Sequence, residues 1–135
     1  MSEEVKPWRH NPGCFWCAHG VRVQVADGHS TIDIVLDERF QGGPTTVHGG
    51  VLTGLVDEAL GQLAGVGAAT ATLEIRFRAP IALGRRVLVE GQIDRRDGRG
   101  YLASATIRYP DDPRARVEAS GRFVFIDARA MGSRA

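Results

Sequence analysis

The tripeptide His48-Gly49-Gly50 and the carboxylate of Asp57 are the residues whose types and spacing could support chemistry. Paired glycines at the start of a helix leave backbone N–H groups without partners, and such groups form a natural site for an anion or an oxyanion. A carboxylate about two turns further along the same helix suits attack on a polarised carbonyl. The alternatives are structural: Asp57 as a surface aspartate favoured by the helix dipole, and His48 as a cap.

The face of the predicted helix that carries Asp57 also carries three glycines, Gly50, Gly54 and Gly61. At about 100° per residue these four positions lie on one side of the helix. A glycine inside a helix costs about 0.5–1 kcal/mol relative to alanine, so this face indicates close approach of another backbone or a ligand. Glu58 lies about a quarter turn away, and we expect an ordinary solvated side chain there.

The helix that positions these residues is predicted over residues 49–64. Its apolar residues have the i, i+3, i+4, i+7 spacing of a buried stripe; they are Leu52, Leu55, Val56, Ala59, Leu60 and Leu63. Alternating apolar and polar residues predict two strands before the helix and four after it. These strands are expected at residues 21–25, 32–36, 70–79, 86–95, 101–109 and 115–126. One apolar-striped helix followed by an antiparallel meander indicates an α+β fold with the sheet wrapped around the helix.

Composition limits the possible classes of protein. The 135 residues fit one domain, predicted over 21–126, after an irregular segment at 1–20 and before a disordered tail at 127–135. The formal charge of +1 lacks the basic excess of a nucleic-acid binder. No apolar run approaches the roughly 20 residues of a membrane span, and no secretory signal is visible. We therefore expect a cytoplasmic protein without nucleic-acid or membrane partners.

The segment from His48 to Gly61, HGGVLTGLVDEALG, resembles the HGG-x6-D-E-A-x-G signature of the hotdog acyl-CoA thioesterases. It is similar to the phenylacetate-pathway and 4-hydroxybenzoyl-CoA branches of that family. The segment TLEIRFRAP at 72–80 is similar to the element that follows the helix, and Gly84 has its usual place. The resemblance covers roughly residues 14–126.

This resemblance implies a hotdog fold, an antiparallel sheet of five to six strands wrapped around one central helix. It also implies a homodimer or a dimer of dimers (a homotetramer) with active sites at the interface. Asp57 would be the nucleophile or the general base for water, and a backbone N–H of Gly49 or Gly50 would polarise the thioester carbonyl. A Ser or Thr on the strand after the helix, from the other subunit, would position the water or the carboxylate. Thr70 aligns best with it, and Thr72 is expected on the same strand face; ordinary strand threonines are the alternative.

One position departs from the family pattern. Related enzymes carry Asn or Gln six residues before the HGG histidine, where this chain has Gly42, and Gln41 stands one residue earlier. A bulge at Gly42-Gly43 would return Gln41 to the site, so Gln41 and His48 complete the catalytic candidates. If Gln41 fails to reach the site, slow turnover or an unusual substrate is expected.

The N-terminal segment contains the residues of a possible zinc site: His10, Cys14, Cys17 and His19. The spacing of the two cysteines suits zinc, but Cys17 and His19 are crowded and the family needs no metal. We therefore expect no metal, and interpret the segment as a packed N-terminal lid with buried thiols.

Arginines are the candidates for the phosphates of coenzyme A, because a guanidinium binds phosphate in a bidentate manner. The adjacent pair Arg85-Arg86, just past a turn, is the first choice. The alternative for each is a solvated residue on a strand face.

These features predict a thioesterase that hydrolyses an acyl- or aryl-CoA thioester, or an acyl-carrier-protein thioester, through Asp57. No cofactor is expected, because coenzyme A is part of the substrate. The alternative from another class is a non-catalytic hotdog protein that binds acyl-CoA or a partner protein. A hotdog dehydratase would need an Asp/His pattern that is absent. The acyl group stays unidentified, because residues from two subunits shape the pocket.

Overall fold

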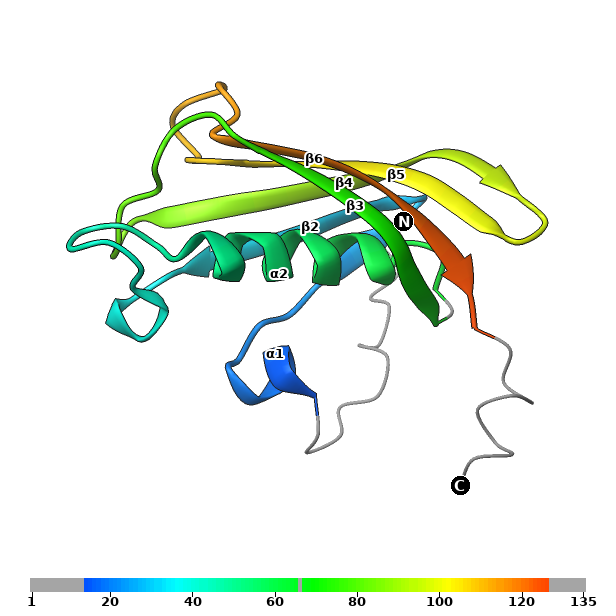
Figure 1. Cartoon of the computed structure of the whole chain (residues 1–135), viewed down its shortest axis with the longest axis horizontal. Coiled ribbons are helices and arrows are strands. Elements are labelled where there is room, and N and C mark those ends of the chain that lie inside the picture. The colour runs from blue at the N-terminus through cyan, green and yellow to red at the C-terminus, as the bar shows by residue number, and fades with distance from the viewer. Residues whose placement is uncertain (1–13, 66, 127–135) are drawn as a thin grey trace.

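Six antiparallel strands curve around one long helix (Figure 1). The computed structural model describes residues 14–65 and 67–126. The helical elements are α1 (Phe15–Ala18), the 3-10 turn η1 (Glu38–Phe40) and α2 (Gly49–Gly61). The strands are β1 (Gln24–Ala26), β2 (His29–Val35), β3 (Ala68–Phe77), β4 (Arg86–Asp97), β5 (Gly100–Arg108) and β6 (Val117–Phe125).

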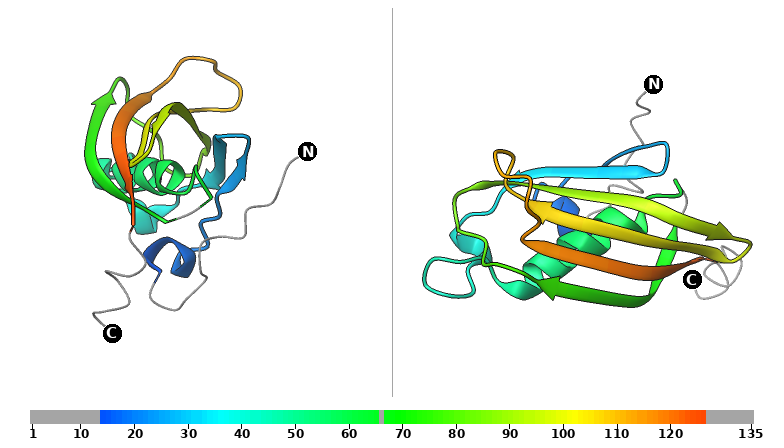
Figure 2. Two further views of the ribbon diagram at one scale, coloured as in Figure 1. Left: turned by 90° about the vertical axis from the view of Figure 1, so that its right-hand side faces the viewer. Right: turned by 90° about the horizontal axis from the view of Figure 1, so that it is seen from above.

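The strand order β1-β2-β4-β5-β6-β3 places β1 and β3 at the two edges of the sheet. In Figure 2 the sheet curves around α2, while α1 lies on the side of α2 that the sheet leaves open. The predicted α+β hotdog architecture is therefore confirmed, with six strands rather than five.

The apolar stripe of α2 holds the helix inside the sheet. Leu55, Val56, Ala59 and Leu60 have no exposed surface. Burying one large aliphatic side chain contributes about 1.5–3 kcal/mol, so together these contacts fix the helix in place. The helix ends at Gly61 rather than at the predicted residue 64.

A buried aromatic pair fastens the far end of the helix to the sheet. Tyr101 on β5 and Phe123 on β6 are stacked, with ring centroids 5.5 Å apart. The Tyr101 hydroxyl donates to the carbonyl oxygen of Leu60 at 2.6 Å. Burial raises the pKa of Tyr101 to about 12, so the hydroxyl keeps its proton at neutral pH.

The N-terminal part of the chain differs from the prediction. Residues 15–18, within the segment predicted to be irregular, form the helical turn α1. The first strand was predicted over 21–25, but its ladder to β2 begins only at Gln24. Val21 and Val23 are buried without joining the ladder, which explains their strand-like pattern. The predictions for residues 1–13 and 127–135 lie outside the described residues.

Within residues 14–65 and 67–126, no helix is both long enough and apolar enough to cross a membrane.

The hairpin between β4 and β5 provides a test of how closely its strands approach β6. A Cβ atom at Gly100 would lie 1.9 Å from the Phe123 carbonyl oxygen, whereas one at Gly98 would meet nothing within 4 Å. Gly100→Ala should lower the free energy of unfolding by about 3 kcal/mol, and Gly98→Ala should change it by less than about 0.5 kcal/mol. Chemical denaturation measures both, and equal midpoints would contradict this packing.

Candidate functional site

The ring of His48 caps the start of α2. Its Nδ1 accepts the Gly50 N–H at 2.8 Å, as the capping alternative predicted. The backbone carbonyl oxygen of His48 accepts hydrogen bonds from the N–H groups of Val51 at 3.0 Å and Leu52 at 3.2 Å. Among the described residues, no acceptor lies within hydrogen-bond distance of the Gly49 N–H. Of the two predicted oxyanion donors, Gly49 therefore has the free amide and Gly50 does not.

The loop before α2 returns Gln41 to the helix start. The His48 N–H donates to the Phe40 carbonyl oxygen at 2.8 Å, and Gln41 forms an isolated bridge with Val47. A Cβ at Gly42 would lie 2.6 Å from the Cα of His48, so only glycine permits this approach. Gln41 thus reaches the helix start, with its side-chain amide donating to the Pro44 carbonyl oxygen at 3.3 Å.

Asp57 is paired with a hydroxyl from β3. The Thr70 hydroxyl donates to Asp57 Oδ1 within the same chain. Thr70 lies opposite Phe123, a fully buried residue, and therefore on the helix-facing side of the sheet. The hydrogen bond fixes the orientation of the carboxylate. Because Asp57 is only half-buried, the carboxylate stays accessible.

Thr72 lies on the opposite strand face from Thr70, so the predicted shared face is wrong. The β3–β6 register shifts between the two residues, with Thr70 opposite Phe123 and Thr72 opposite Arg122. The extra residue in this bulge reverses the side to which the later side chains point. The Thr72 hydroxyl accepts the Arg122 N–H at 3.2 Å, on the outer face.

The free amide and the carboxylate are separated along one helix. Gly49 and Asp57 stand eight positions apart. At roughly 1.5 Å of rise per residue, about 12 Å of helix axis lies between them. The two groups of one chain are therefore too far apart to act on the same carbonyl carbon.

Glu58 is not the solvated side chain that its helix position suggested. It is half-buried and accepts a hydrogen bond from the Gln62 amide. Burial raises the pKa of Glu58 above its usual 4.5; the hydrogen bond from Gln62 opposes the rise, and the neighbouring Asp57 adds to it. α1 lies on the open side of α2, where Cys17 interacts electrostatically with Glu58, and sequence periodicity does not reveal this neighbour.

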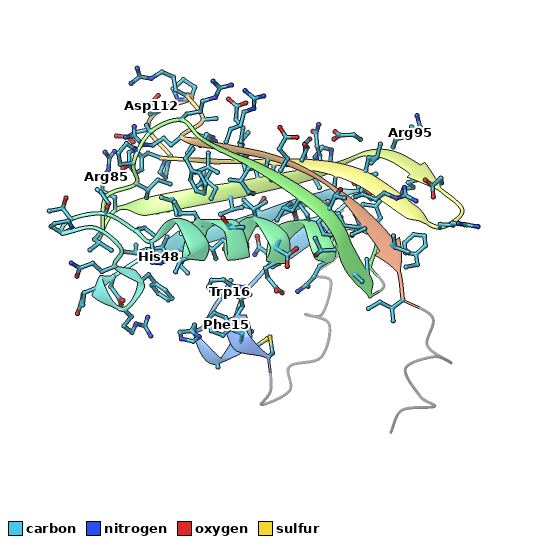
Figure 3. All side chains as sticks on the ribbon, viewed as in Figure 1. Phe15, Trp16, His48, Arg85, Arg95 and Asp112 are labelled. Atoms are coloured by element: carbon cyan, nitrogen blue, oxygen red, sulfur yellow. The ribbon has the colours of Figure 1, made fainter. Side chains whose placement is uncertain are left out.

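The glycine face of α2 receives a side chain of its own chain. A Cβ at Gly54 would lie 2.5 Å from Cζ2 of Trp16. Figure 3 shows Trp16 and Phe15 on α1, below α2, with His48 near the helix start. The glycine face predicted close approach of another backbone or a ligand, but at Gly54 the close neighbour is the side chain of Trp16 of α1.

A cavity of about 350 Å³ opens between α1, η1 and the first turn of α2. Its apolar walls are Phe15, Trp16, Phe40 and Val51, and its polar lining is Arg39, Gln41, His48 and Gly50. Sequence reasoning did not assign Phe15, Trp16 or Phe40 to a site. The sequence did contain one indication of this cavity: aromatic residues near the N-terminus, together with a glycine inside the helix that could accommodate one of them.

The cysteines of α1 contact each other. Cys14 Sγ accepts the Cys17 N–H at 3.2 Å, and both thiols are free and half-buried. The hydrogen bond with the Cys14 thiol, together with burial, raises the pKa of Cys17 to about 11. The His19 ring donates to the Phe15 carbonyl oxygen at 2.8 Å. His10, the fourth residue of the possible zinc site, lies outside the described residues.

The predicted phosphate-binding arginines already have partners. Arg86 forms a bidentate pair with Asp33 at 2.7 and 2.6 Å. Arg85 donates to Asp111 at 3.1 Å and stacks on Tyr109, with its guanidinium carbon 3.5 Å from the ring centroid. Arg85 lies at the same end of the molecule as His48 (Figure 3). An incoming phosphate would have to compete with these carboxylates.

Comparisons with known proteins identify similar sequences and similar folds. The model of the Thioesterase superfamily matches residues 45–112, just over half of the chain. Bovine acyl-coenzyme A thioesterase THEM4 is 36% identical over 88 residues, which are 65% of this chain. The match spans only 37% of the length of that relative.

Solved structures show the same architecture. A thioesterase superfamily protein has a TM-score of 0.69 and 30% identity, covering 77% of this chain and 53% of that one. The E. coli PaaI protein from the phenylacetic acid degradation operon has a TM-score of 0.75, covering 83% of this chain and 85% of its own. Its identity is 18%, so this likeness concerns the fold alone.

Because the pKa of Glu58 is raised, we expect Glu58→Gln to increase the stability of the fold in a pH-dependent way. Because the folded chain holds this proton more strongly than the unfolded chain, the ionised carboxylate lowers stability above the folded-state pKa. That cost disappears as the pH falls to 4.5. The melting temperature of Glu58→Gln should therefore exceed wild type at neutral pH, with the difference shrinking under acid.

The matched control is Glu74→Gln, since the Glu74 side chain is 73% exposed on β3. It should show little difference from wild type at either pH. A Glu58→Gln variant that melts below wild type at neutral pH would contradict the burial-driven shift.

Proposed function

Because the chain belongs to the Thioesterase superfamily, we propose that it hydrolyses an acyl-CoA thioester with Asp57 as its catalytic carboxylate. The observation that carries the proposal is the carboxylate of Asp57, oriented by the Thr70 hydroxyl. The substrate class is supported by the name of the bovine relative, an acyl-coenzyme A thioesterase.

The proposed chemistry is addition of water to the thioester carbonyl. Asp57 accepts a proton from the water as its oxygen bonds to the carbonyl carbon, and the carbonyl oxygen gains negative charge. A Gly49 N–H donates to that oxygen. The oxyanion then collapses, the C–S bond breaks, and the thiolate of coenzyme A leaves and takes up the proton. In the variant with Asp57 as nucleophile, the carboxylate attacks first and water cleaves the resulting anhydride.

We propose that each site combines two chains. About 12 Å of helix axis separates Gly49 from Asp57 within one chain, whereas a two-fold axis beside antiparallel helices would bring Gly49 of one chain opposite Asp57 of the other. β3 is an edge strand whose Phe77 ring is 54% exposed, so it offers a surface for such pairing. The interface thus completes the site.

Of the predicted pair Arg85-Arg86, we propose Arg85 for a phosphate of coenzyme A. It lies at the end of the molecule where α2 begins, and its contact with Asp111 is solvent-exposed. Exposed ion pairs contribute at most about 1 kcal/mol, so a phosphate can displace the carboxylate at small cost. Arg86 is held more firmly by its two hydrogen bonds to Asp33.

Asp57→Asn should lower kcat/KM by about 10²–10⁴-fold, because the amide cannot accept the proton of water. The measurement is release of free thiol from a panel of acyl-CoA thioesters. Glu74→Gln, an exposed carboxylate on the outer face of β3, serves as the control and should retain the wild-type rate. Unchanged hydrolysis by Asp57→Asn would make the assignment wrong, and a wild-type chain that binds thioesters without releasing thiol would favour the non-catalytic alternative.

The Gly49 amide can be removed without disturbing the helix. Proline suits the first helical position, and the preceding His48 has φ −60° and ψ 130°, which proline tolerates. Gly49→Pro should therefore fold normally but lose about 10²–10³-fold in kcat. Gly49→Ala keeps the N–H, and its Cβ would make only an ordinary 3.6 Å contact with Phe77, so it should remain active.

Combining the two defects tests the two-chain site. Equal co-expression of Asp57→Asn and Gly49→Pro chains should restore about a quarter of wild-type activity, because half the dimers are mixed and each has one intact site. No restoration would mean that both groups act within a single chain.

A further inference from the structure

We propose that Cys14 and Cys17 form a reversible dithiol–disulfide couple, and that the disulfide locks the turn α1 against α2. The co-reactant is a low-molecular-weight disulfide such as oxidised glutathione. The two residues are the only cysteines of the chain, and both thiols are free and half-buried. The proposed hydrolysis at Asp57 uses neither thiol, so this inference does not depend on it.

The two sulfur atoms lie within reach of each other. Cys14 Sγ accepts the Cys17 N–H at 3.2 Å, and the Cys17 thiol makes a hydrogen bond with the Cys14 thiol. Cys14 precedes α1 as its N-cap, and Cys17 is the third residue of the helical turn. The backbone therefore brings both side chains to one side of the turn. An S–S bond requires rotation about the Cα–Cβ bonds rather than a rearrangement of the chain.

The surroundings of the pair suit thiol chemistry better than metal binding. A structural zinc site takes four ligands. Within residues 14–65 and 67–126, no group of three or more histidine, cysteine, aspartate or glutamate side chains is arranged to hold a metal ion. The ring of His19, which follows the pair, donates to the Phe15 carbonyl oxygen at 2.8 Å. Two thiols with the Cys-x-x-Cys spacing are a typical redox pair.

The protonation of the pair sets the order of the two steps of oxidation. The hydrogen bond with Cys14, together with burial and the nearby Glu58, raises the pKa of Cys17 to about 11. Cys17 therefore keeps its proton at neutral pH, and Cys14 is the sulfur that attacks first. The first step consumes the Cys14 thiol and so removes the main cause of this shift, which makes Cys17 available for the second step.

The reaction is two successive thiol–disulfide exchanges. The Cys14 sulfur bonds to one sulfur of oxidised glutathione, the S–S bond of that molecule breaks, and the released glutathione thiolate takes up the Cys14 proton. The Cys17 sulfur then bonds to the Cys14 sulfur, and the second glutathione leaves with the Cys17 proton. The chain thus loses two hydrogen atoms, and oxidised glutathione is reduced to two molecules of the thiol.

The disulfide closes a ring around the two aromatic residues of α1, Phe15 and Trp16. α1 has only four residues, and isolated helices shorter than about 12 residues are marginal in water. It therefore depends on contacts outside itself, such as that of the Trp16 indole with α2, where a Gly54 Cβ would lie 2.5 Å from Cζ2. A link between Cys14 and Cys17 removes open conformations of the turn and thereby holds Trp16 against α2.

A redox titration of the full chain tests the couple. Wild type is equilibrated in mixtures of reduced and oxidised glutathione with a chelator present, quenched with acid and analysed by mass spectrometry. We expect chains that have lost two hydrogen atoms and carry no glutathione, and excess reduced glutathione should reverse this loss. Cys17→Ser should instead accumulate one glutathione, bound at Cys14. Two unmodified thiols in the most oxidising mixture, or wild type that retains glutathione without an internal disulfide, would overturn the couple.

Hydrogen exchange measured by NMR tests the lock. The amides of Ala18 and His19 close the α1 turn, since they donate to the carbonyl oxygens of Cys14 at 3.1 Å and Trp16 at 3.0 Å. In the oxidised chain these amides should exchange about tenfold more slowly than in the reduced chain, because opening of the turn is restricted. The amides of β5 are the internal control and should exchange at the same rate in both states.

The position of Trp16 shows whether the locked turn stays on α2. In spectra of the oxidised chain, the Trp16 ring should keep its nuclear Overhauser contact with the α-protons of Gly54, against which it packs. The double variant Cys14→Ser and Cys17→Ser is the matched control, and its α1 amides should exchange at one rate with or without oxidised glutathione. Faster exchange of the α1 amides after oxidation, or loss of the contact between Trp16 and Gly54, would refute the lock.

Discussion

Leu55, Val56, Ala59 and Leu60 of α2 lose all contact with solvent inside the curved sheet, and the other features of the molecule depend on this interface. It fixes the rotation of the helix about its own axis, because turning an apolar stripe into water would expose several large side chains at about 1.5–3 kcal/mol each. The sheet therefore leaves the opposite face of α2 uncovered, and at Gly54 this face contacts Trp16 of α1. The first turn, with its free amide, is held at one end of the sheet.

The face of α2 opposite the apolar stripe makes two different contacts at two positions along the helix. At Asp57 it presents a carboxylate to the edge strand β3, where Thr70 orients it. At Gly54 it accepts the indole of Trp16, which brings α1 against the first turns of the helix. The amide of Gly49 lies about 12 Å from Asp57 along the axis, so the proposed chemistry depends on pairing with a second helix. One buried stripe thus fixes both where Trp16 contacts α2 and where Asp57 meets Thr70.

Local patterns predicted most of the fold. The spacing of Leu52, Leu55 and Leu60 identified the buried helix face, and Asp27-Gly28 has the left-handed φ angles, 52° and 73°, that a tight hairpin requires. Two of the wrong predictions depend on contacts between residues far apart in the sequence. The bulge between Thr70 and Thr72 adds a residue to one strand, and nothing in the alternation shows it. Glu58 was expected in water, but it is half-buried and interacts with Cys17 of α1, a distant part of the sequence.

The sequence by itself determined that a helix begins at the HGG turn and places a carboxylate eight positions later, because periodicity and glycine spacing are local properties. The sequence left open which amide is free, and the structure shows that the His48 ring accepts the Gly50 N–H, a local contact that the sequence offered as one alternative. Only the tertiary structure decided what covers the glycine face. The cover of the glycine face depends on the contact of Trp16 with Gly54, between residues far apart in the chain. The alternation of apolar and polar residues carries no information about such contacts.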